Sequence, residues 1–556
     1  MADSIPKPII FVVATAIESV LITLAVPQYL PAHPLLYVFW RLFALQFTVY
    51  SIYVLSIYPR FISPLRHLPG PTTGAKPLIG HGLALSKLPR GSVFLDWMKT
   101  IPNDGLLRFR GLFNVNSLVI TDPKGLAEVL VTRTYDFEKP VQLRNFLRRI
   151  IGDGLIIVEG DVHRFQRKHA MPAFSFRHIK DLYPIFNDKS NALTQRLSQE
   201  VAGKLQPGQD SAVIEINHWA NLVTMDIIGM AAMGRDFQSL RNTDDPLIKL
   251  YEELLEPTGE KQLLFVAMVF MPALTRLLPW KTAKRVDYIT ENLTDICIKL
   301  VRDKKEAMKT ESANHKDILS LLIQSNNFSD QQLVDQLLTF LAAGHETTSS
   351  AFTWTTYLLT QNPKILAALR EEVRAAGLPS RSSPTPANVD VASILESLPL
   401  LNGVCNETLR LFPTVPMTSR VANKDSQVLG EHIPKGTRLV LCMYAINRHP
   451  DLWGANADEF VPERWIDTDP STGERRPNAS GGAPTNYALL TFLHGPRSCI
   501  GQGFAKAELR CLVAAFVNAF DFEMADPNEE IIVHGVVTTK PKNGMNLRLK
   551  YIGDQS

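Results

Sequence analysis

Two long apolar stretches separate the N-terminal end of this chain from everything that follows. Ile9 to Val26 contains a single charged residue, Glu18, and Leu42 to Tyr58 contains none. Each stretch is just long enough to cross a bilayer as a helix. We therefore predict that residues 1–58 form a membrane anchor with one or two transmembrane helices. One span would place the N-terminus in the lumen, whereas two would place both chain ends in the cytosol, and the sequence leaves both arrangements open.

A proline-rich segment follows the second apolar stretch. Residues 59–75 hold prolines at positions 59, 64, 69 and 71, and proline restricts the backbone. This segment is expected to be a stiff hinge. Arg60 and Arg66 flank the apolar stretch, and positive charge next to a span favours the cytosolic side. Residues 76–556 are therefore expected to form one large cytosolic domain.

The spacing of apolar and polar residues in residues 76–556 predicts mostly helices. Ser329 and Gln332 form a capping box that opens an apolar-periodic helix, which runs to Asn362-Pro363. Ser117–Thr121 and Arg438–Leu441 have the composition of strands. Asn543-Gly544, between residues 538–540 and 547–549, predicts a hairpin turn. The expected fold class is mainly α with small β-sheets.

Composition narrows the class of protein. The chain has 556 residues, 45% of them apolar, and a net charge of +3, which gives no reason to expect a nucleic-acid partner. Its five cysteines are scattered without a CxxC pair, which favours a reducing compartment without disulfides.

One cysteine stands in an unusual loop. Phe492, Gly495, Arg497, Cys499 and Gly501 follow the spacing Phe-x-x-Gly-x-Arg-x-Cys-x-Gly just before an apolar-periodic helix. Glycine lets the backbone approach a flat group closely, and a nearby cation favours a thiolate. This arrangement is typical of a cysteine that holds a haem iron. The alternative is a buried structural cysteine, which is the common role of a lone cysteine.

The long predicted helix has a polar centre. Ala343-Gly344-His345-Glu346-Thr347-Thr348 interrupts its apolar pattern, and such local conflicts are expected at functional sites. The alternative is a helix kink with solvated polar residues.

Two further blocks carry charged residues. Glu407 and Arg410 lie at i, i+3 on a short helix that Pro413 ends, and Arg464 follows downstream. Alone, such a pair is an ordinary surface ion pair. His163 and Arg167 stand in a basic segment that could equally be a solvated helix face.

Together these blocks resemble the signatures of the cytochrome P450 monooxygenases, from roughly Pro64 to the C-terminus. The resemblance implies the cytochrome P450 fold with an N-terminal membrane anchor, and haem b (iron protoporphyrin IX) with Cys499 as the iron ligand. Phe492, Gly495 and Gly501 would shape the cysteine loop. The haem propionates would meet Arg497, Arg167, His163 and Arg420. Many members have Trp at the place of His163, so this position departs from the pattern but keeps a hydrogen-bond donor.

The resemblance also assigns roles to the polar helix centre and to the charged block of Glu407, Arg410 and Arg464. Ala343 and Gly344 would leave space for O2 above the iron, Thr347 would form a hydrogen bond to the activated oxygen, and Glu346 would relay protons. Glu407, Arg410 and Arg464 would form a buried network that braces the loop before the cysteine.

The function implied is insertion of one oxygen atom from O2 into a lipophilic small molecule, as in hydroxylation or epoxidation, in fungal secondary-metabolite biosynthesis. The expected location is the endoplasmic reticulum membrane. Only 57 residues follow Cys499, too few for a fused flavin domain, so a separate NADPH-cytochrome P450 reductase is the expected electron donor. Two alternatives stay open: a haem-thiolate isomerase or peroxygenase, and a non-catalytic membrane haem-binding protein.

Overall fold

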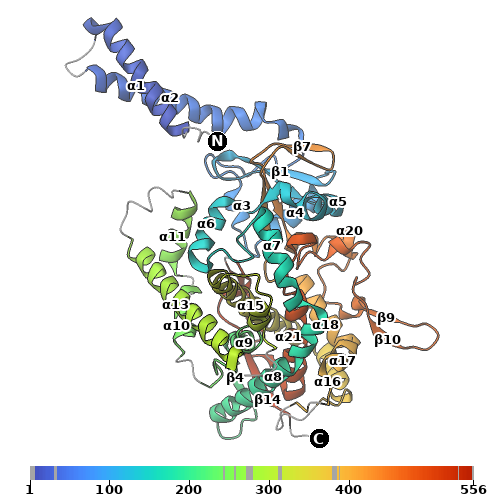
Figure 1. The fold of residues 1–556 in the computed structure, drawn as a ribbon. Helices are drawn as coiled ribbons and strands as arrows, with labels where there is room; N and C mark the ends of the chain where they lie inside the picture. Colours follow the sequence, from blue (N-terminus) through green and yellow to red (C-terminus); the bar gives the residue numbers. More distant parts are fainter. Residues whose placement is uncertain are drawn as a thin grey trace. The chain divides into compact units, whose positions relative to one another are not determined.

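The computed structural model describes residues 7–553, except 30–33, 242–244, 256–257, 271–279, 311–315, 379–384, 387 and 536. Residues 1–6 and 30–33 of the predicted anchor thus lie outside the described part. The chain forms two compact units. Unit 1 holds residues 1–86 and 107–118, and unit 2 holds residues 87–106 and 119–556. The elements of the described chain are labelled in Figure 1.

Unit 1 begins with an antiparallel helical hairpin of α1 (Lys7–Ala25) and α2 (Pro34–Ile52). The ring of Phe11 lies 6.3 Å from that of Tyr50, and Thr15 Oγ1 donates to Gln46 Oε1 at 2.7 Å. Gln46 in turn donates to Glu18. The partners run in opposite directions along the two helices, so the hairpin is antiparallel. Its polar side chains bond to one another, as they must in an apolar surrounding.

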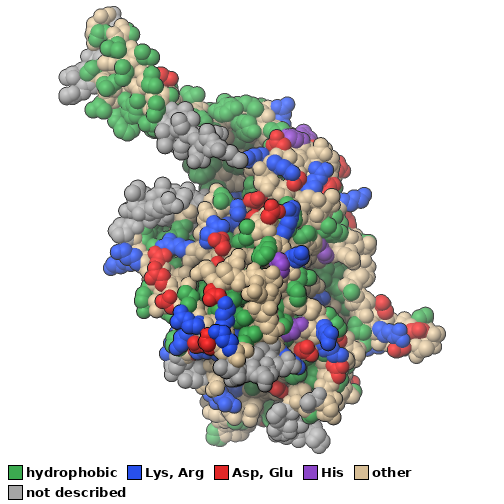
Figure 2. Space-filling view, in the orientation of Figure 1, with side chains coloured by type: hydrophobic (Ala, Val, Ile, Leu, Met, Phe, Trp, Pro, Cys, Tyr) green, Lys and Arg blue, Asp and Glu red, His purple; other side chains and the backbone are tan. Residues whose placement is uncertain are grey.

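The second helix of the hairpin has the length and composition of a membrane span. α2 continues without a break into the wide π-helical turns of η2 (Tyr53–Ile62). Within Pro34–Ile62 an 18-residue window reaches a mean hydropathy of 1.4, and only 6% of that window is buried. Apolar side chains cover the visible face of α1 and α2 in Figure 2. One apolar helix in this part of the chain is therefore consistent with an anchor. The unit also holds η1 (Pro27–Tyr29), η3 (Pro64–His67), α3 (Gly82–Leu85) and η4 (Leu112–Asn114).

Unit 2 is built around the long helix α15 (Asp330–Thr360), which starts at the capping box that the sequence predicted. Ser329 Oγ accepts from the Gln332 N–H, and the Gln332 side chain accepts from the Ser329 N–H. This helix packs against α9 (Ile216–Ile228), α13 (Lys281–Thr310) and α21 (Gln502–Ala519), as Figure 1 shows. The other α-helices are α4 (Ser92–Thr100), α5 (Pro123–Ala127), α6 (Val141–Ile151), α7 (Gly160–Ala170), α8 (Phe176–Lys204), α10 (Pro246–Leu255), α11 (Gly259–Phe270), α14 (Ile318–Gln324), α16 (Pro363–Ala375), α17 (Val391–Ser397), α18 (Pro399–Leu411), α19 (Met443–Ile446) and α20 (Pro450–Trp453).

The strands form small sheets. β11 (Phe520–Met524), β14 (Asn546–Tyr551) and β4 (Ala212–Glu215) pair antiparallel in that order, with Phe522 opposite Leu549 and Leu547 opposite Ile214. β3 (Phe137–Glu138) pairs with β5 (Thr418–Ala422), which pairs with β8 (Arg438–Leu441). The remaining strands are β1 (Leu106–Arg110), β2 (Asn116–Ile120), β6 (Ser426–Val428), β7 (Glu431–Ile433), β9 (Ile466–Thr468), β10 (Arg475–Pro477), β12 (Val533–His534) and β13 (Lys540–Pro541).

The predicted fold class, mainly α with small sheets, is confirmed, and the two predicted strands are β2 and β8. The predicted C-terminal hairpin is wrong. The chain does turn at Gly544, where φ is +79°, but β13 pairs with β12 while β14 pairs with β11 and β4. Turn residues fix a local reversal of the chain and not the choice of partner strand. β14 buries Leu547 and Leu549 between two other strands, and that burial decides its pairing.

Candidate active site

The cysteine loop is held in shape by its own backbone. The Cys499 N–H donates to the Phe492 carbonyl at 2.9 Å, which closes the loop around η11 (Gly495–Arg497). Gly495 has φ +74°, and a Cβ at this position would lie 2.1 Å from the Leu130 carbonyl oxygen. No other residue fits there. Gly501 ends the loop, and α21 begins at the next residue.

Cys499 differs from the other four cysteines because its side chain is exposed, while the others are buried. All five thiols are free. Water can reach Cys499, yet the surrounding protein still raises the pKa of its thiol by desolvation. The Gly501 N–H and the Arg167 cation act in the opposite direction and favour the thiolate. Cys499 is thus an accessible thiol with two groups that stabilise its anion.

Arg497, two residues before the cysteine, is buried with its charge paired to Glu159. Its Nη2 atom pairs with Glu159 Oε2, and its Nη1 atom donates to the Phe137 carbonyl. The guanidinium lies 4.8 Å from the centre of the Tyr135 ring. Its Nε atom has no hydrogen-bond partner among the described residues. An unpaired, buried guanidinium N–H is costly unless an acceptor meets it.

Two more cations lie near the same carboxylate. The Lys139 N–H donates to Glu159 Oε1 at 2.9 Å, and its Nζ lies 3.5 Å from that oxygen. Arg420 is 3% exposed, and its Nη1 donates to the Ser419 carbonyl at 3.0 Å. Desolvation lowers the pKa of Lys139 to about 8 and that of Arg420 to about 10. Sequence reasoning missed Lys139 and Glu159, which carry no motif of their own.

His163 and Arg167, one turn apart on α7, reach the same region. His163 is buried, and its Nδ1 lies 3.3 Å from the Tyr135 hydroxyl. Desolvation first, then the cations of Lys139 and Arg497, lower the pKa of His163 to about 4, so its ring is neutral at neutral pH. Arg167 donates to the Ser498 carbonyl at 2.5 Å and to the Ser498 hydroxyl at 3.3 Å. Arg167 therefore ties α7 to the residue next to Cys499.

The polar centre of α15 does not kink the helix, which continues from Asp330 to Thr360. Ala343 is exposed there, although Leu341 and His345 beside it are buried. The Thr347 hydroxyl donates to the Ala343 carbonyl at 2.8 Å. The missing side chain of Gly344 would point at Ile228 of α9, with its Cβ 2.6 Å from Ile228 Cδ1. Close packing of two helices thus accounts for glycine at position 344, and Ala343 is the residue with an open face.

Glu346 has a partner that the sequence did not indicate. Its Oε1 atom lies 2.9 Å from Lys540 Nζ, at the start of β13. The neighbouring Thr348 directs its hydroxyl at the Gly344 carbonyl, 3.3 Å away. Glu508 of α21, also near Thr348, is 1% exposed, and neither carboxyl oxygen has a hydrogen-bond partner among the described residues. Desolvation raises the pKa of Glu508 well above its usual value.

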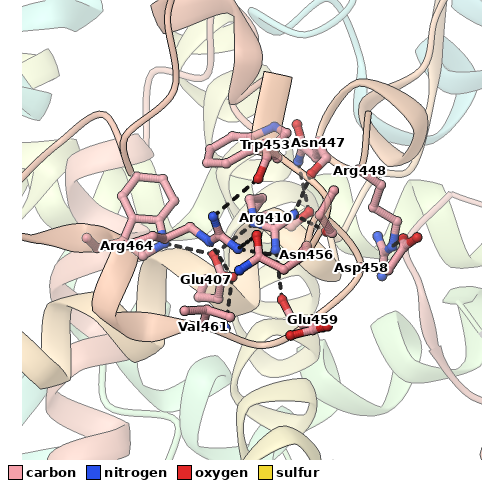
Figure 3. A network of polar contacts seen from close by, with 12 residues as sticks. Glu407, Arg410, Asn447, Arg448, Trp453, Asn456, Asp458, Glu459, Val461 and Arg464 are labelled. Carbon is pink, nitrogen blue, oxygen red and sulfur yellow. Dashed lines mark hydrogen bonds and ion pairs between the residues drawn. The ribbon is translucent and has the colours of Figure 1, made fainter. Parts of the chain in front are cut away.

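The three residues of the charged block, Glu407, Arg410 and Arg464, come together around the Glu407 carboxylate (Figure 3). Arg410 Nε and Nη2 each donate to Glu407 at 2.8 Å, and Arg464 Nε donates to Glu407 Oε1 at 2.9 Å. Arg410 also donates to the Asn447, Ala457 and Glu459 carbonyls. Desolvation alone would raise the pKa of Glu407, but Arg410 and then Arg464 hold it below its usual value. This cluster joins α18 to the segment of residues 447–464.

The residues present fit a haem. Lys139, Arg167, Arg420 and Arg497 bring four cations to one region. Glu159 is the carboxylate that Arg497 and Lys139 share there, whereas the nearby Glu138 is paired with Arg144. Buried cations in such excess call for anionic partners, and a haem carries two propionates. Within the described residues, no group of three or more His, Cys, Asp or Glu side chains could hold a bare metal ion. A porphyrin that brings four of its own ligands needs one protein sulfur, which Cys499 offers.

Comparisons with known proteins agree with this geometry. The family model of cytochrome P450 matches residues 69–547. The chain is 42% identical over 498 residues to "Cytochrome P450 monooxygenase sphH" of Aspergillus fumigatus, covering 89% of this chain and 90% of the relative. It is 37% identical to "Cytochrome P450 monooxygenase ptmK" of Penicillium ochrochloron, covering 90% and 96%. It is also 37% identical to "Cytochrome P450 monooxygenase FUM15" of Gibberella moniliformis, covering 92% of each chain. The chain therefore belongs to the cytochrome P450 family and is a haem-thiolate monooxygenase, an oxidoreductase that acts on a lipophilic substrate with O2 and a redox partner.

Proposed function

We propose that this chain binds haem b through Cys499 and oxidises a lipophilic small molecule in a fungal secondary-metabolite pathway. It does so at the endoplasmic reticulum, anchored by residues 1–58, with the hinge of residues 59–75 leading to a cytosolic catalytic domain of residues 76–556. NADPH-cytochrome P450 reductase supplies its electrons. The observation that carries the proposal is one accessible thiol, Cys499, beside a buried region with more cations than carboxylates.

Cys499 is the iron ligand in this proposal. When bound, the haem supplies the activation of O2, and a thiolate ligand favours cleavage of the O–O bond. The loop residues keep the sulfur in place: Gly495 lets the chain pass Leu130, and the Phe492 carbonyl holds the Cys499 N–H. The Gly501 N–H and Arg167 favour the anion of the sulfur.

The cation cluster holds the two propionates. Arg497 and Arg420 offer guanidinium groups, which suit carboxylates because they can donate two parallel hydrogen bonds. Lys139 and Arg167 add charge, and His163, neutral in the absence of the cofactor, adds a ring N–H. Each of these side chains is held by other protein groups already, so little conformational entropy is lost when the propionates bind.

Glu346 and Thr347 handle protons on the α15 side. Lys540 pairs with the Glu346 carboxylate and keeps it in one place, where a carboxyl group can act as a proton relay. The Thr347 hydroxyl donates to the Ala343 carbonyl, which leaves its oxygen free to accept a hydrogen bond. Rotation of the hydroxyl would turn it into a donor toward the open face of Ala343. The hydroxyl can thus accept one hydrogen bond and donate another.

The membrane and the redox partner follow from the anchor. A lipophilic substrate concentrates in the bilayer, and an anchored enzyme meets it there together with a membrane-bound reductase. The Pro34–Ile62 helix supports a cytosolic catalytic domain, since Arg60 lies in its last turn and Arg66 follows it. The relatives named above all come from fungi, which supports a place in fungal secondary metabolism.

The ligand assignment is tested by Cys499→Ala in the full-length protein. The variant should lose the carbon monoxide difference band of the reduced thiolate-ligated haem. Cys405→Ala is the matched control, because Cys405 is a buried thiol on α18 and should leave the band intact. A band that survives Cys499→Ala would refute the assignment.

The electron source is tested with purified holoprotein. NADPH with the reductase should support product formation from an extract of the producing cells, and hydrogen peroxide alone should not. Equal turnover with peroxide would instead favour the peroxygenase alternative. Comparison of metabolites with and without the active gene then identifies the substrate.

A further inference from the structure

A cavity of about 320 Å³ lies in unit 1, where the apolar helix ends. One wall comes from the last turns of α2 and from η2, with Phe47, Ile52 and Leu55 as apolar contributors. The rest of the lining comes from residues 75–77, Arg110 and Asn114. All of these residues belong to unit 1. The cavity therefore combines the end of the predicted membrane span with the first segment of the polar part of the chain.

The cavity is lined by three cations and by no acidic side chain. Arg60, Lys76 and Arg110 line it. Desolvation and then the nearby charges of Arg60 and Arg108 lower the pKa of Arg110, which means that these cations repel one another. From residue 19 to 86 and from 107 to 118 the sequence has six Lys or Arg residues and no Asp or Glu. Glu18, the one acidic residue of unit 1 that the structure describes, accepts a bond from Gln46 and does not line the cavity.

The wall of the cavity also offers one unpaired acceptor. Asn114 is 5% exposed, and its Nδ2 donates to the Leu55 carbonyl at 2.9 Å. Its Oδ1 has no partner among the described residues, although the side chain lines the cavity. The nearby Asn116 donates to the Pro59 carbonyl at 3.2 Å. Two asparagines thus fix the π-helical turns of η2, and one of them presents an acceptor that a hydroxyl or ammonium group would satisfy.

The apolar part of the wall is continuous with the exposed face of the same helix. Leu45, Phe47 and Ile52 are each more than half exposed. A ligand with only a soluble anionic group would gain nothing from Phe47 and Ile52. A ligand with an anionic head and an acyl chain would place the chain along α2 and the head among the cations.

We propose that this cavity binds the headgroup of an anionic phospholipid that carries hydroxyl groups, such as phosphatidylinositol. The phosphate lies among Arg60, Lys76 and Arg110, and a headgroup hydroxyl donates to Asn114 Oδ1. The acyl chains follow the apolar face of α2. This inference rests on the proposed membrane anchor and is independent of the haem.

The test uses full-length holoprotein in bilayer discs of phosphatidylcholine with a minor share of phosphatidylinositol. The measured quantity is the ratio of the two lipids that remain with the protein after purification. The wild type should enrich phosphatidylinositol, and Arg60→Gln and Arg110→Gln should each reduce the enrichment about fivefold. Arg66→Gln is the matched control, because Arg66 is an exposed arginine of the same segment that does not line the cavity. Equal losses in all three variants would mean unspecific attraction and overturn the proposal.

Two further measurements distinguish a lipid from a soluble anion as the ligand, and test the membrane anchor separately. Free inositol phosphate should fail to compete, and competition at the same concentration as the lipid would assign the cavity to a soluble anion instead. The protein should also resist extraction from membranes by carbonate. Extraction would overturn the anchor and with it this inference, whereas resistance without enrichment would overturn the lipid site alone.

Discussion

Glu407 and Arg410, one turn apart on α18, form a two-point ion pair in which neither side chain is exposed to solvent. Glu407 accepts further bonds from Arg464 Nε at 2.9 Å, from Trp465 Nε1 at 2.9 Å and from the Val461 N–H at 3.1 Å. A single carboxylate therefore connects α18 with residues 461–465. The surface pair that the sequence alone would suggest is in fact a buried junction.

We expect Glu407→Gln to be strongly destabilising. The change leaves the Arg410 and Arg464 charges without their partner, and breaking a buried pair costs about 3–5 kcal/mol. Urea unfolding and the haem content of the purified protein measure the effect.

Glu474→Gln is the control for this variant, since Glu474 pairs with Arg476 on the surface and should leave the urea midpoint almost unchanged. Similar losses of stability in the two variants would show that the buried network contributes no more to stability than a surface ion pair.

Thr347→Ala should leave haem bound but lower the share of reducing equivalents that reach product. The variant lacks the hydroxyl that, in the proposed function, takes part in proton delivery together with Glu346. The loss should appear as hydrogen peroxide per NADPH consumed, and a loss of about tenfold or more in product formation is in the range of proton-transfer catalysis.

The matched control on the same helix is Thr360→Ala. Thr360 makes the same kind of intrahelical bond, to the Tyr357 carbonyl at 2.7 Å, at the far end of α15. Unchanged coupling in Thr347→Ala would remove this hydroxyl from the proton path.

Lys139→Met should weaken haem retention. Lys139 is the cation that only the folded chain brings to Glu159, and loss of one charged hydrogen bond to a propionate would lower affinity about tenfold or more. Transfer of haem to apomyoglobin gives the dissociation rate. Lys424→Met, a more exposed lysine paired with Asp136, should release haem at the wild-type rate. If Lys139→Met released haem at the wild-type rate, Lys139 would not contact a propionate and the assignment would be wrong.

Glu508 should make the protein less stable as pH rises. Its pKa is raised in the folded protein, so the folded state keeps a proton that the unfolded state loses above the ordinary carboxyl pKa. Stability from this group is full at acid pH and declines as pH increases toward the folded pKa.

Glu508→Gln removes that decline, because an amide does not titrate. The variant should gain up to about 1.4 kcal/mol over wild type for each pH unit above the unfolded pKa. Urea unfolding at several pH values measures the difference. A difference that does not change with pH would mean that Glu508 is ionised in the folded state.

The hairpin of α1 and α2 predicts where the N-terminus lies. If both helices cross the bilayer in the antiparallel arrangement that Thr15 and Gln46 fix, a glycosylation acceptor added before Lys7 stays cytosolic and unmodified. A gel shift on expression in microsomes measures this. Modification of the added acceptor would mean that only the Pro34–Ile62 helix crosses.

The sequence by itself determined the features that depend on neighbouring residues. The cysteine loop lies within ten consecutive residues, and the Ser329 capping box within four, so their geometry follows from local backbone preferences. The same holds for the helical character of the chain and for β8, whose bounds match the predicted strand. The pair of Glu407 and Arg410 also follows from helical spacing, although its burial does not.

Only the tertiary structure decided which distant residues meet. Lys139 reaches Glu159, Lys540 reaches Glu346, and Ile228 fills the space beside Gly344 because strands and helices far apart in the chain pack together. The C-terminal turn was predicted correctly while its strand partners were not, since pairing is set by which surfaces can be buried. Motifs specify local geometry. The net charge of the site depends instead on side chains from distant segments, and only tertiary packing brings those side chains close enough to interact.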